Sequence, residues 1–277
     1  MLEIGINTNN ECGKDINEIL NNIKKNGFNN VMIAARGENF EEAIKKAVDL
    51  GLKVPYIHLD NSYSDDLWVV GEANDKYVQS VIDQIKLCGK YNIPIAVMHA
   101  TIGDPAKVII KPNKNAISSM LKILDVAKDM KVKIAIENID TLNFQHFQYL
   151  LDNIKSEWLG FCYDVGHHHL YNPKFDIVKK YGSRLIAIHL HDNLMDWKYG
   201  LDWTRDMHYL PFDGKIDFEK VCEKLAKTNY ANVVMLEVHK RSASKPIIYK
   251  DKSVDEFLSE AYKRGLKLKD LIEEYKK

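Results

Sequence analysis

The sequence predicts an α/β protein with a single (β/α)8 TIM barrel domain over residues 1–277, and three observations carry this prediction. Eight short apolar runs rich in β-branched residues recur along the chain. Segments with the period of amphipathic helices separate these runs. The length of 277 residues also suits one barrel, which typically needs about 250. An open doubly wound sheet is the alternative, but it does not require eight repeats.

The apolar runs predict the strands. They are nearly continuously apolar, as expected for parallel strands that are covered on both faces. In chain order they are residues 2–6 (LEIGI), 30–34 (NVMIA), 53–59 (KVPYIHL), 94–100 (PIAVMHA), 132–138 (VKIAIEN), 159–164 (LGFCYD), 185–192 (LIAIHLHD) and 232–238 (NVVMLEV).

The segments between the runs predict the helices. Gly27 and Gly51 each follow a periodic segment, at the position where helices often end with glycine. No linker or low-complexity segment interrupts the alternation, so we expect one domain. The clearest helical segments are residues 16–27, 40–51, 76–90, 116–130 and 218–229, and residues 254–277 would form the closing helix.

Composition narrows the functional classes. Hydrophobic residues make up 45% and charged residues 28%, which allows a sizeable core. The net charge of zero lacks the positive excess of a typical nucleic-acid binder. The first residues, MLEIGINTNN, do not resemble a signal peptide and no long apolar run is present, so we expect a cytoplasmic protein without a membrane partner. The four cysteines form no CxxC pair and are expected to be reduced, buried thiols: Cys12, Cys88, Cys162 and Cys222.

Ionisable residues stand at the ends of six consecutive predicted strands. The C-terminal strand ends of a (β/α)8 barrel surround one mouth, which is the usual place of catalysis in this fold. We therefore expect these side chains to meet there: His58, His99, Glu137, Asp164, His189 and Glu237. Three further residues can join them from loops: His167, Asp206 and His208.

Imidazole and carboxylate together indicate a divalent ion such as Zn, Mn, Co or Fe(II) rather than Mg or Ca. Taken singly, His58 and His99 are more often hydrogen-bonded core residues. A carboxylate that ends an apolar strand is harder to explain in that way, because burying it unpaired is costly. This argument applies to Glu137 and Glu237. The role of His191, two residues beyond His189, stays open.

These residues lie in motifs that resemble those of the xylose-isomerase-like TIM barrel superfamily, which includes sugar phosphate isomerases and epimerases and AP endonuclease family 2. The resemblance covers essentially the whole chain, and its most specific pieces are IAIEN (134–138), CYDVGHH (162–168), IHLHDN (188–193), DMHYLPFDGKID (206–217) and MLEV (235–238). The epimerase branch implies a metal held by four of the residues, with His167 contacting substrate. The four implied ligands are Glu137, Asp164, His189 and Glu237.

The resemblance implies a metal-dependent isomerase or epimerase of a sugar, sugar phosphate or polyol. Glu137 and Glu237 would transfer a proton through an enediolate, and the ion would be Mn, Zn or Co. The partner would be a small carbohydrate, and a homo-oligomer is compatible with the sequence. Trp68, Trp197 and Trp203 would form the pocket wall, although each is equally well a packing residue.

Three alternatives stay open: a dehydratase of the same superfamily, a barrel that binds without turnover, and a phosphodiesterase resembling endonuclease IV. The last type holds three zinc ions with nine ligands, and all nine matching positions carry a suitable residue here. They are His58, His99, Glu137, Asp164, His167, His189, Asp206, His208 and Glu237. Acidic residues in the loops after the second and third strands oppose a nucleic-acid partner, which we therefore do not expect.

Overall fold

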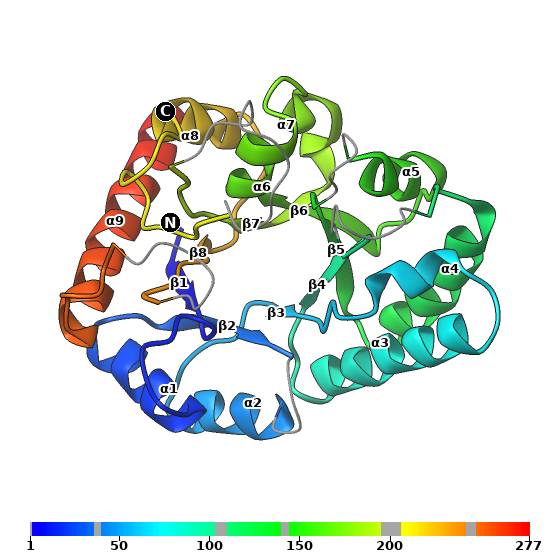
Figure 1. Ribbon diagram of the computed structural model, residues 1–277, viewed down its shortest axis with the longest axis horizontal. Coiled ribbons are helices and arrows are strands. Elements are labelled where there is room, and N and C mark those ends of the chain that lie inside the picture. Colours follow the sequence, from blue (N-terminus) through cyan, green and yellow to red (C-terminus); the bar gives the residue numbers. More distant parts are fainter. Residues whose placement is uncertain (1, 36–39, 103–109, 140–143, 195–205, 242–247) are drawn as a thin grey trace.

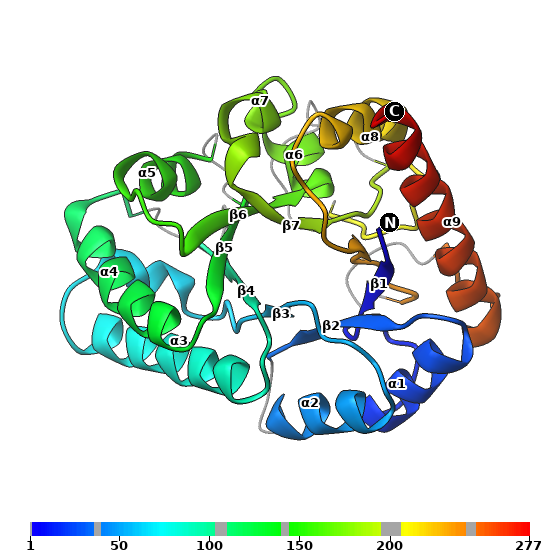
Figure 2. The same ribbon diagram turned by 180° about the vertical axis from the view of Figure 1, so that it is seen from behind.

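The computed structural model describes residues 2–35, 40–102, 110–139, 144–194, 206–241 and 248–277. Parallel strands form an inner ring, and helices cover this ring on the outside (Figure 1). The view from behind shows the same two layers at the other end of the ring (Figure 2). This arrangement confirms the predicted (β/α)8 barrel.

The strands follow one another around the ring in chain order. Neighbouring strands pair in parallel from β1 to β7, and β8 pairs with β1. A parallel bridge between Leu190 and Leu236 links β7 to β8 on the remaining side. The strands are β1 (Ile4–Asn7), β2 (Asn30–Ala34), β3 (Ile57–His58), β4 (Ile95–His99), β5 (Lys133–Glu137), β6 (Leu159–Asp164), β7 (Leu185–His189) and β8 (Val234–Leu236).

Helices alternate with these strands. Gly27 and Gly51 follow the first two helices with positive φ angles of 92° and 68°, as their expected role at helix ends requires. The helices are α1 (Ile16–Lys25), α2 (Phe40–Asp49), α3 (Glu72–Lys90), α4 (Lys114–Asp129), α5 (Gln145–Asn153), α6 (Val165–Tyr171), α7 (Ile177–Tyr181), α8 (Phe218–Ala226) and α9 (Val254–Tyr275), with short 3-10 turns η1 (Ser64–Trp68) and η2 (Gly182–Arg184).

Two predicted strands are shorter than expected. The run at 53–59 contributes only Ile57–His58 to the ring, while Lys53 makes an isolated bridge to Asn30. Pro55 lies between them and has no N–H to donate to a neighbouring strand, which accounts for the break. The run at 232–238 contributes only Val234–Leu236, so Glu237 lies just beyond the strand.

The core has two parts. A large cluster packs between the strands and the helices, and a smaller cluster fills the inside of the barrel. The buried residues of the inner cluster are Met32, Tyr56, Ile95, Val97, Ala135, Cys162, Ala187, Val233 and Met235. All four cysteines are free and buried, as expected.

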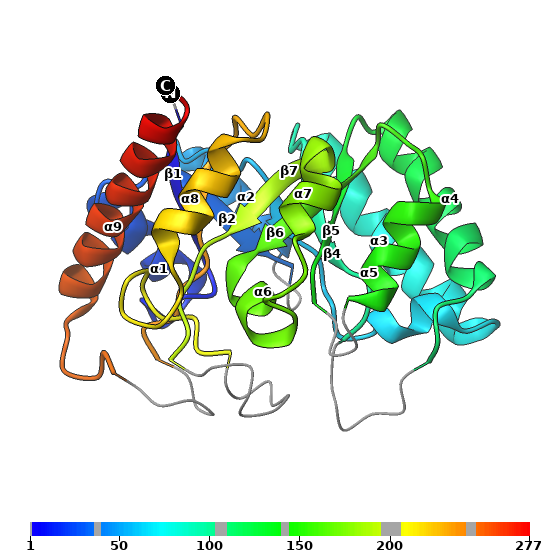
Figure 3. The same cartoon turned by 90° about the horizontal axis from the view of Figure 1, so that it is seen from above.

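The short helix α6 lies at the end of the barrel opposite to both chain termini (Figure 3). Because α6 directly follows Asp164, this is the end at which the parallel strands finish. Among the described helices, none is long and apolar enough to cross a membrane.

Candidate metal centre

The inward-facing positions at the strand ends form a ring above the inner cluster. Side chains alternate along a strand, so the residue two positions after an inward one also points inward. On β1, Gly5 faces inward because an added Cβ would lie 2.7 Å from Met235 of the inner cluster. The next inward positions on the eight strands are Asn7, Ala34, His58, His99, Glu137, Asp164, His189 and Glu237.

Four members of this ring form a central group: Glu137, Asp164, His189 and Glu237. One donor atom from each lies within 4.8 Å of every other. His189 Nδ1 lies 2.9 Å from Glu237 Oε2, 3.5 Å from Glu137 Oε2 and 3.7 Å from Asp164 Oδ2. The sequence places these residues on four neighbouring strands, and parallel pairing from β5 to β7 with the bridge to β8 brings them side by side.

The central group has the properties of a metal site. His189 is completely buried, and within the described chain neither of its ring nitrogens makes a well-aligned hydrogen bond, although Nδ1 lies within ion-pair distance of the three carboxylates. Oε2 of Glu237 is also buried without a well-oriented donor in that part of the chain. Buried polar atoms are rarely left unpaired, because the lost solvation is costly. A cation among these atoms would satisfy them, and three carboxylates with one imidazole suit a divalent metal.

A second group shares Glu137 with the first. His58 Nε2 and His99 Nε2 lie 3.1 and 3.2 Å from Glu137 Oε2, and the two nitrogens are 3.1 Å apart. His58 Nδ1 lies 2.8 Å from the carbonyl oxygen of Leu59, which fits donation by the other side of the ring. We call His58, His99 and Glu137 the side group. Because Glu137 belongs to both groups, its carboxylate can bridge them.

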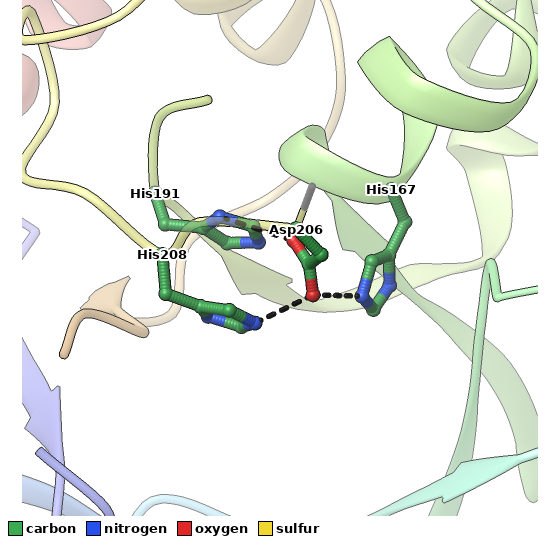
Figure 4. Close-up of side chains that lie close together, drawn as sticks. All are labelled: His167, His191, Asp206 and His208. Atoms are coloured by element: carbon green, nitrogen blue, oxygen red, sulfur yellow. Dashed lines mark hydrogen bonds and ion pairs between the residues drawn. The ribbon is translucent and has the colours of Figure 1, made fainter. Parts of the chain in front are cut away.

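The third group lies beside the ring. His167 comes from α6, His191 follows β7, and Asp206 and His208 come from the next described segment (Figure 4). Asp206 Oδ2 lies 2.7 Å from His208 Nε2 and 3.3 Å from His167 Nε2. His191 Nδ1 is 3.8 Å from the other oxygen, Oδ1. We call these four residues the outer group.

Carboxylates and imidazoles in the centre shift each other's pKa in opposite directions. Burial alone would raise the pKa of the Glu137 carboxyl, but His189 and His99 hold this pKa well below its usual range. Burial likewise opposes ionisation of Asp164, yet the adjacent imidazoles lower its pKa to about 2. Burial disfavours charged imidazole, but neighbouring anions raise the pKa of His167 and His189 well above its ordinary value. Before a metal binds, the carboxylates are therefore ionised and these histidines carry protons.

The structure brings together all nine ionisable residues singled out from the sequence, distributed over the central, side and outer groups. Their roles as ligands or catalysts remain proposals. His191 is a member of the outer group to which the sequence assigned no role. Asn7 was not singled out either, although it is 1% exposed and completes the ring. Its Oδ1 accepts from the Val238 N–H, and its Nδ2 has no partner in the described chain.

The three tryptophans have different outcomes. Trp68 is 2% exposed, donates its indole N–H to the carbonyl of Ala100 at 2.6 Å, and packs against His146 at a ring distance of 4.6 Å. These contacts correspond to the packing alternative. Trp197 and Trp203 lie outside the described residues, so their expected place in the pocket wall stays a prediction.

Comparison with known proteins agrees with this architecture. The family model described as "Xylose isomerase-like TIM barrel" matches residues 12–264. The chain belongs to this family. Curated relatives include the uncharacterized protein y4fM of Sinorhizobium fredii, with 28% identity over 58% of this chain, and the uncharacterized protein MJ1311 of Methanocaldococcus jannaschii, with 29% identity over 44%. The matches cover 52% and 42% of those proteins, about half of their length.

Solved structures similar to this xylose isomerase-like barrel include several epimerases. A zinc-bound structure of IolI aligns with a TM-score of 0.76 at 16% identity, covering 99% of both chains. D-psicose 3-epimerase from Clostridium cellulolyticum, solved with D-tagatose, aligns at 0.72 and 15% over 100% of both chains. The 3-keto-D-glucoside 4-epimerase YcjR of E. coli aligns at 0.70 and 17%, covering 95% of this chain and 99% of that one. At these identities the likeness shows the fold.

Proposed function

We propose that this xylose isomerase-like barrel is a divalent-metal-dependent isomerase or epimerase of a small carbohydrate. One observation carries the proposal: Glu137 and Glu237, from β5 and the end of β8, both approach His189 within the central group. The similar solved structures of sugar epimerases support the same reaction class, since they share the fold that places these strand ends. Glu137, Asp164, His189 and Glu237 would hold the ion.

The bound ion would act as a Lewis acid toward adjacent carbonyl and hydroxyl oxygens of the substrate. One of the two glutamates would remove the proton from the carbon next to the carbonyl, which leaves an enediolate. The other would return a proton to the opposite face for epimerisation, or a proton would return to the neighbouring carbon for isomerisation. Burial opposes ionisation of Glu137 and Glu237, but His189 holds the pKa of both well below its usual range, so either carboxylate can abstract a proton. The glutamate that returns a proton would first take one from a neighbouring protonated imidazole or from solvent.

One side of the ring carries no metal-ligand side chain. The ring residues that belong to the central and side groups come from β3 to β8. The ring positions on β1 and β2 are Asn7 and Ala34. Ala34 has a small side chain, and the Asn7 Nδ2 has hydrogens to donate. We place the sugar on this side, with the Asn7 amide donating to a hydroxyl oxygen.

Solvent exchange tests this function directly. The protein is incubated with Mn or Zn and a panel of ketoses and inososes in deuterated water, and NMR follows the proton next to the carbonyl. We expect the wild-type protein to exchange that proton and to form a second sugar. Glu137→Gln and Glu237→Gln should each lower the rate by at least about 100-fold, since acid–base groups contribute about 10²–10⁴-fold. The exposed Glu157→Gln is the matched control. No exchange with any sugar in the panel would count against the proposal.

A second candidate rests on the sharing of Glu137 between the central and side groups. With the outer group, the chain offers three adjacent sites, as expected for a three-zinc phosphodiesterase. Elemental mass spectrometry on untagged protein, purified without chelator, separates the candidates. About three zinc ions per chain, one of them held by the side group, favour the phosphodiesterase, whereas an unoccupied side group favours the isomerase. His58→Ala would then remove an ion and all activity on abasic-site DNA; under the isomerase model the catalytic ion remains.

A further inference from the structure

The outer group contains four possible metal ligands. Three of them, His167, Asp206 and His208, match ligand positions of the three-zinc phosphodiesterase. His191 is the added residue, and it is completely buried. Its Nδ1 lies 3.8 Å from Asp206 Oδ1 and has no hydrogen bond within the described chain. Figure 4 shows the His191 and His208 rings on one side of Asp206 and the His167 ring on the other. Four side chains from three parts of the chain thus surround one small volume.

The distances suit a tetrahedral ion. Metal–ligand bonds of about 2.0–2.1 Å place tetrahedral donors about 3.3 Å apart. Within the outer group, the separations from Asp206 oxygens are 2.7 Å to His208 Nε2, 3.3 Å to His167 Nε2 and 3.8 Å to His191 Nδ1. The two distances to Oδ2 lie near the tetrahedral separation, and one donor atom from each of the four residues lies within 4.8 Å of every other, so the side chains must draw together to bind an ion.

In two of the imidazoles, the ring nitrogen that points away from Asp206 already has a hydrogen-bond partner. His208 Nδ1 lies 2.8 Å from the carbonyl oxygen of Glu237, to which its N–H donates. His191 Nε2 lies 3.1 Å from both carboxylate oxygens of Asp164. Histidines that bind metals usually donate their other N–H to a carboxylate or carbonyl in this way, which fixes the tautomer. Once an ion displaces any proton on them, the remaining nitrogens, His208 Nε2 and His191 Nδ1, would present their lone pairs on the side of Asp206.

Packing holds His191 in this orientation. Its ring stacks on His208 with centroids 3.9 Å apart, and His208 stacks on His239 at 4.5 Å. On the other side, His191 lies directly over Gly166, where an added Cβ would approach His191 Cε1 at 1.9 Å. Glycine at position 166 is therefore needed for His191 to lie there. His208 also has a left-handed backbone, with φ of 51°, which is unfavourable for a residue with a side chain unless its surroundings hold it.

We propose that His167, His191, Asp206 and His208 bind a structural zinc ion that is separate from the ion of the central group. Four protein ligands fill a tetrahedral site and leave no position for substrate, which is the property of a structural zinc. The ion would fasten the segment around Asp206 and His208 to α6 and to the end of β7. This inference goes beyond the proposed function, because it holds whichever reaction the central group performs.

Zinc stoichiometry and zinc-dependent stability of the whole chain test the proposal. Untagged protein is stripped with a chelator, reloaded with zinc and dialysed, and zinc per chain and Tm are measured for each variant. His191→Leu should lose about one zinc per chain and most of the rise in Tm that zinc produces. His168→Leu is the matched control, because His168 is a buried neighbouring histidine whose nitrogens contact Tyr163 and Phe175 instead. It should keep the wild-type zinc content.

Glu237→Gln separates this site from the central group. This variant should bind the central ion more weakly, but it should keep the zinc of the outer group and most of the zinc-dependent rise in Tm. If His191→Leu does not fold, His208→Gln is measured in the same way, together with the visible spectrum of the cobalt-loaded wild-type protein, where intense bands mark a tetrahedral site. A wild-type zinc content and Tm rise in the folded outer-group variant would overturn the proposal. So would the loss of the whole zinc-dependent Tm rise in Glu237→Gln alone.

Discussion

Asn138 and Asp164 form a reciprocal pair at the ends of β5 and β6. The Asn138 side chain donates to the Asp164 carbonyl at 2.8 Å and accepts from the Asp164 N–H at 2.7 Å. Asn138 is completely buried and follows Glu137 directly. The Asn138 amide thus fixes the backbone of Asp164 relative to the chain that carries Glu137. Both carboxylates belong to the central group, and the contact lies where the regular pairing of β5 and β6 ends.

Asn138→Ala should therefore weaken both the fold and metal binding. The substitution leaves the buried N–H of Asp164 without its side-chain acceptor and removes one donor to the Asp164 carbonyl, which we expect to lower the free energy of unfolding by about 1–3 kcal/mol. Misplacing Asp164 should weaken metal binding by about 10–100-fold. Urea denaturation of the metal-free protein measures the first effect, and metal titration measures the second. Asn153→Ala, at an exposed position, is the control. Equal metal affinity in both variants would show that the amide does not position Asp164.

Metal binding should strengthen as pH rises. In the metal-free chain, burial opposes protonation of His189, but the surrounding anions raise its pKa well above the ordinary value. A metal must displace this proton, so protons compete with the ion below the raised pKa and cease to compete above it. Affinity should rise by up to about tenfold per pH unit for each proton displaced. Calorimetry in buffers of different ionisation enthalpy should detect proton release. A dissociation constant that is the same at about pH 6 and about pH 8 would contradict this expectation.

Much of the site could be predicted because strand ends can be located in the sequence. Six consecutive apolar runs end at or near an ionisable residue, and parallel pairing in chain order brings their ends to one mouth. This is why Glu137, Asp164 and His189 could be grouped without coordinates. The bounds of β3 were harder to predict, because Pro55 interrupts the strand pairing within the run 53–59.

Contacts between loops could not be predicted in the same way. The place of His191 depends on how the chain bends after β7 and on the space left above Gly166. The position of Asn7 in the ring depends on Gly5 facing inward beside Met235 of the neighbouring strand β8. In both cases a side chain gains its surroundings from residues far away in sequence. Periodicity and spacing contain no information about such contacts.

Gly166→Ala should displace His191 without removing any donor atom. The new Cβ would meet His191 Cε1 at 1.9 Å, so the ring or α6 must move. Overpacking of this kind typically costs about 1–3 kcal/mol. We expect a lower Tm and weaker zinc binding in the outer group, measured by thermal unfolding and by zinc content. Gly182→Ala is the control, because its Cβ would meet only the ends of two side chains, Thr228 Cγ2 at 3.3 Å and Val178 Cγ1 at 3.5 Å. If Gly166→Ala kept the wild-type Tm and zinc content, the close approach of His191 would have no energetic consequence.

Asp192 organises the segment that follows His208. Its Oδ1 accepts from the N–H groups of Asn193 and Ile216 at 2.8 and 3.1 Å. Its Oδ2 accepts from Phe212 and Gly214 at 3.0 and 2.8 Å. A single buried carboxylate therefore satisfies four backbone donors, and it holds Phe212 in a left-handed conformation with φ of 75°. This explains how a segment without helix or strand periodicity keeps a defined path.

Asp192→Asn should loosen this segment although the side chain keeps its size. An amide offers one accepting oxygen, and its NH2 group would face two backbone donors with nothing to accept from them. We expect the free energy of unfolding to fall by about 2–4 kcal/mol, since each buried unpaired donor costs about 1–3 kcal/mol. Hydrogen exchange should speed up at the amides of Phe212, Gly214 and Ile216 before it does so in the barrel strands. The exposed Asp49→Asn is the matched control. Unchanged protection of these amides would mean that the turn is held by other contacts, and the outer group would then not depend on Asp192 for the position of His208.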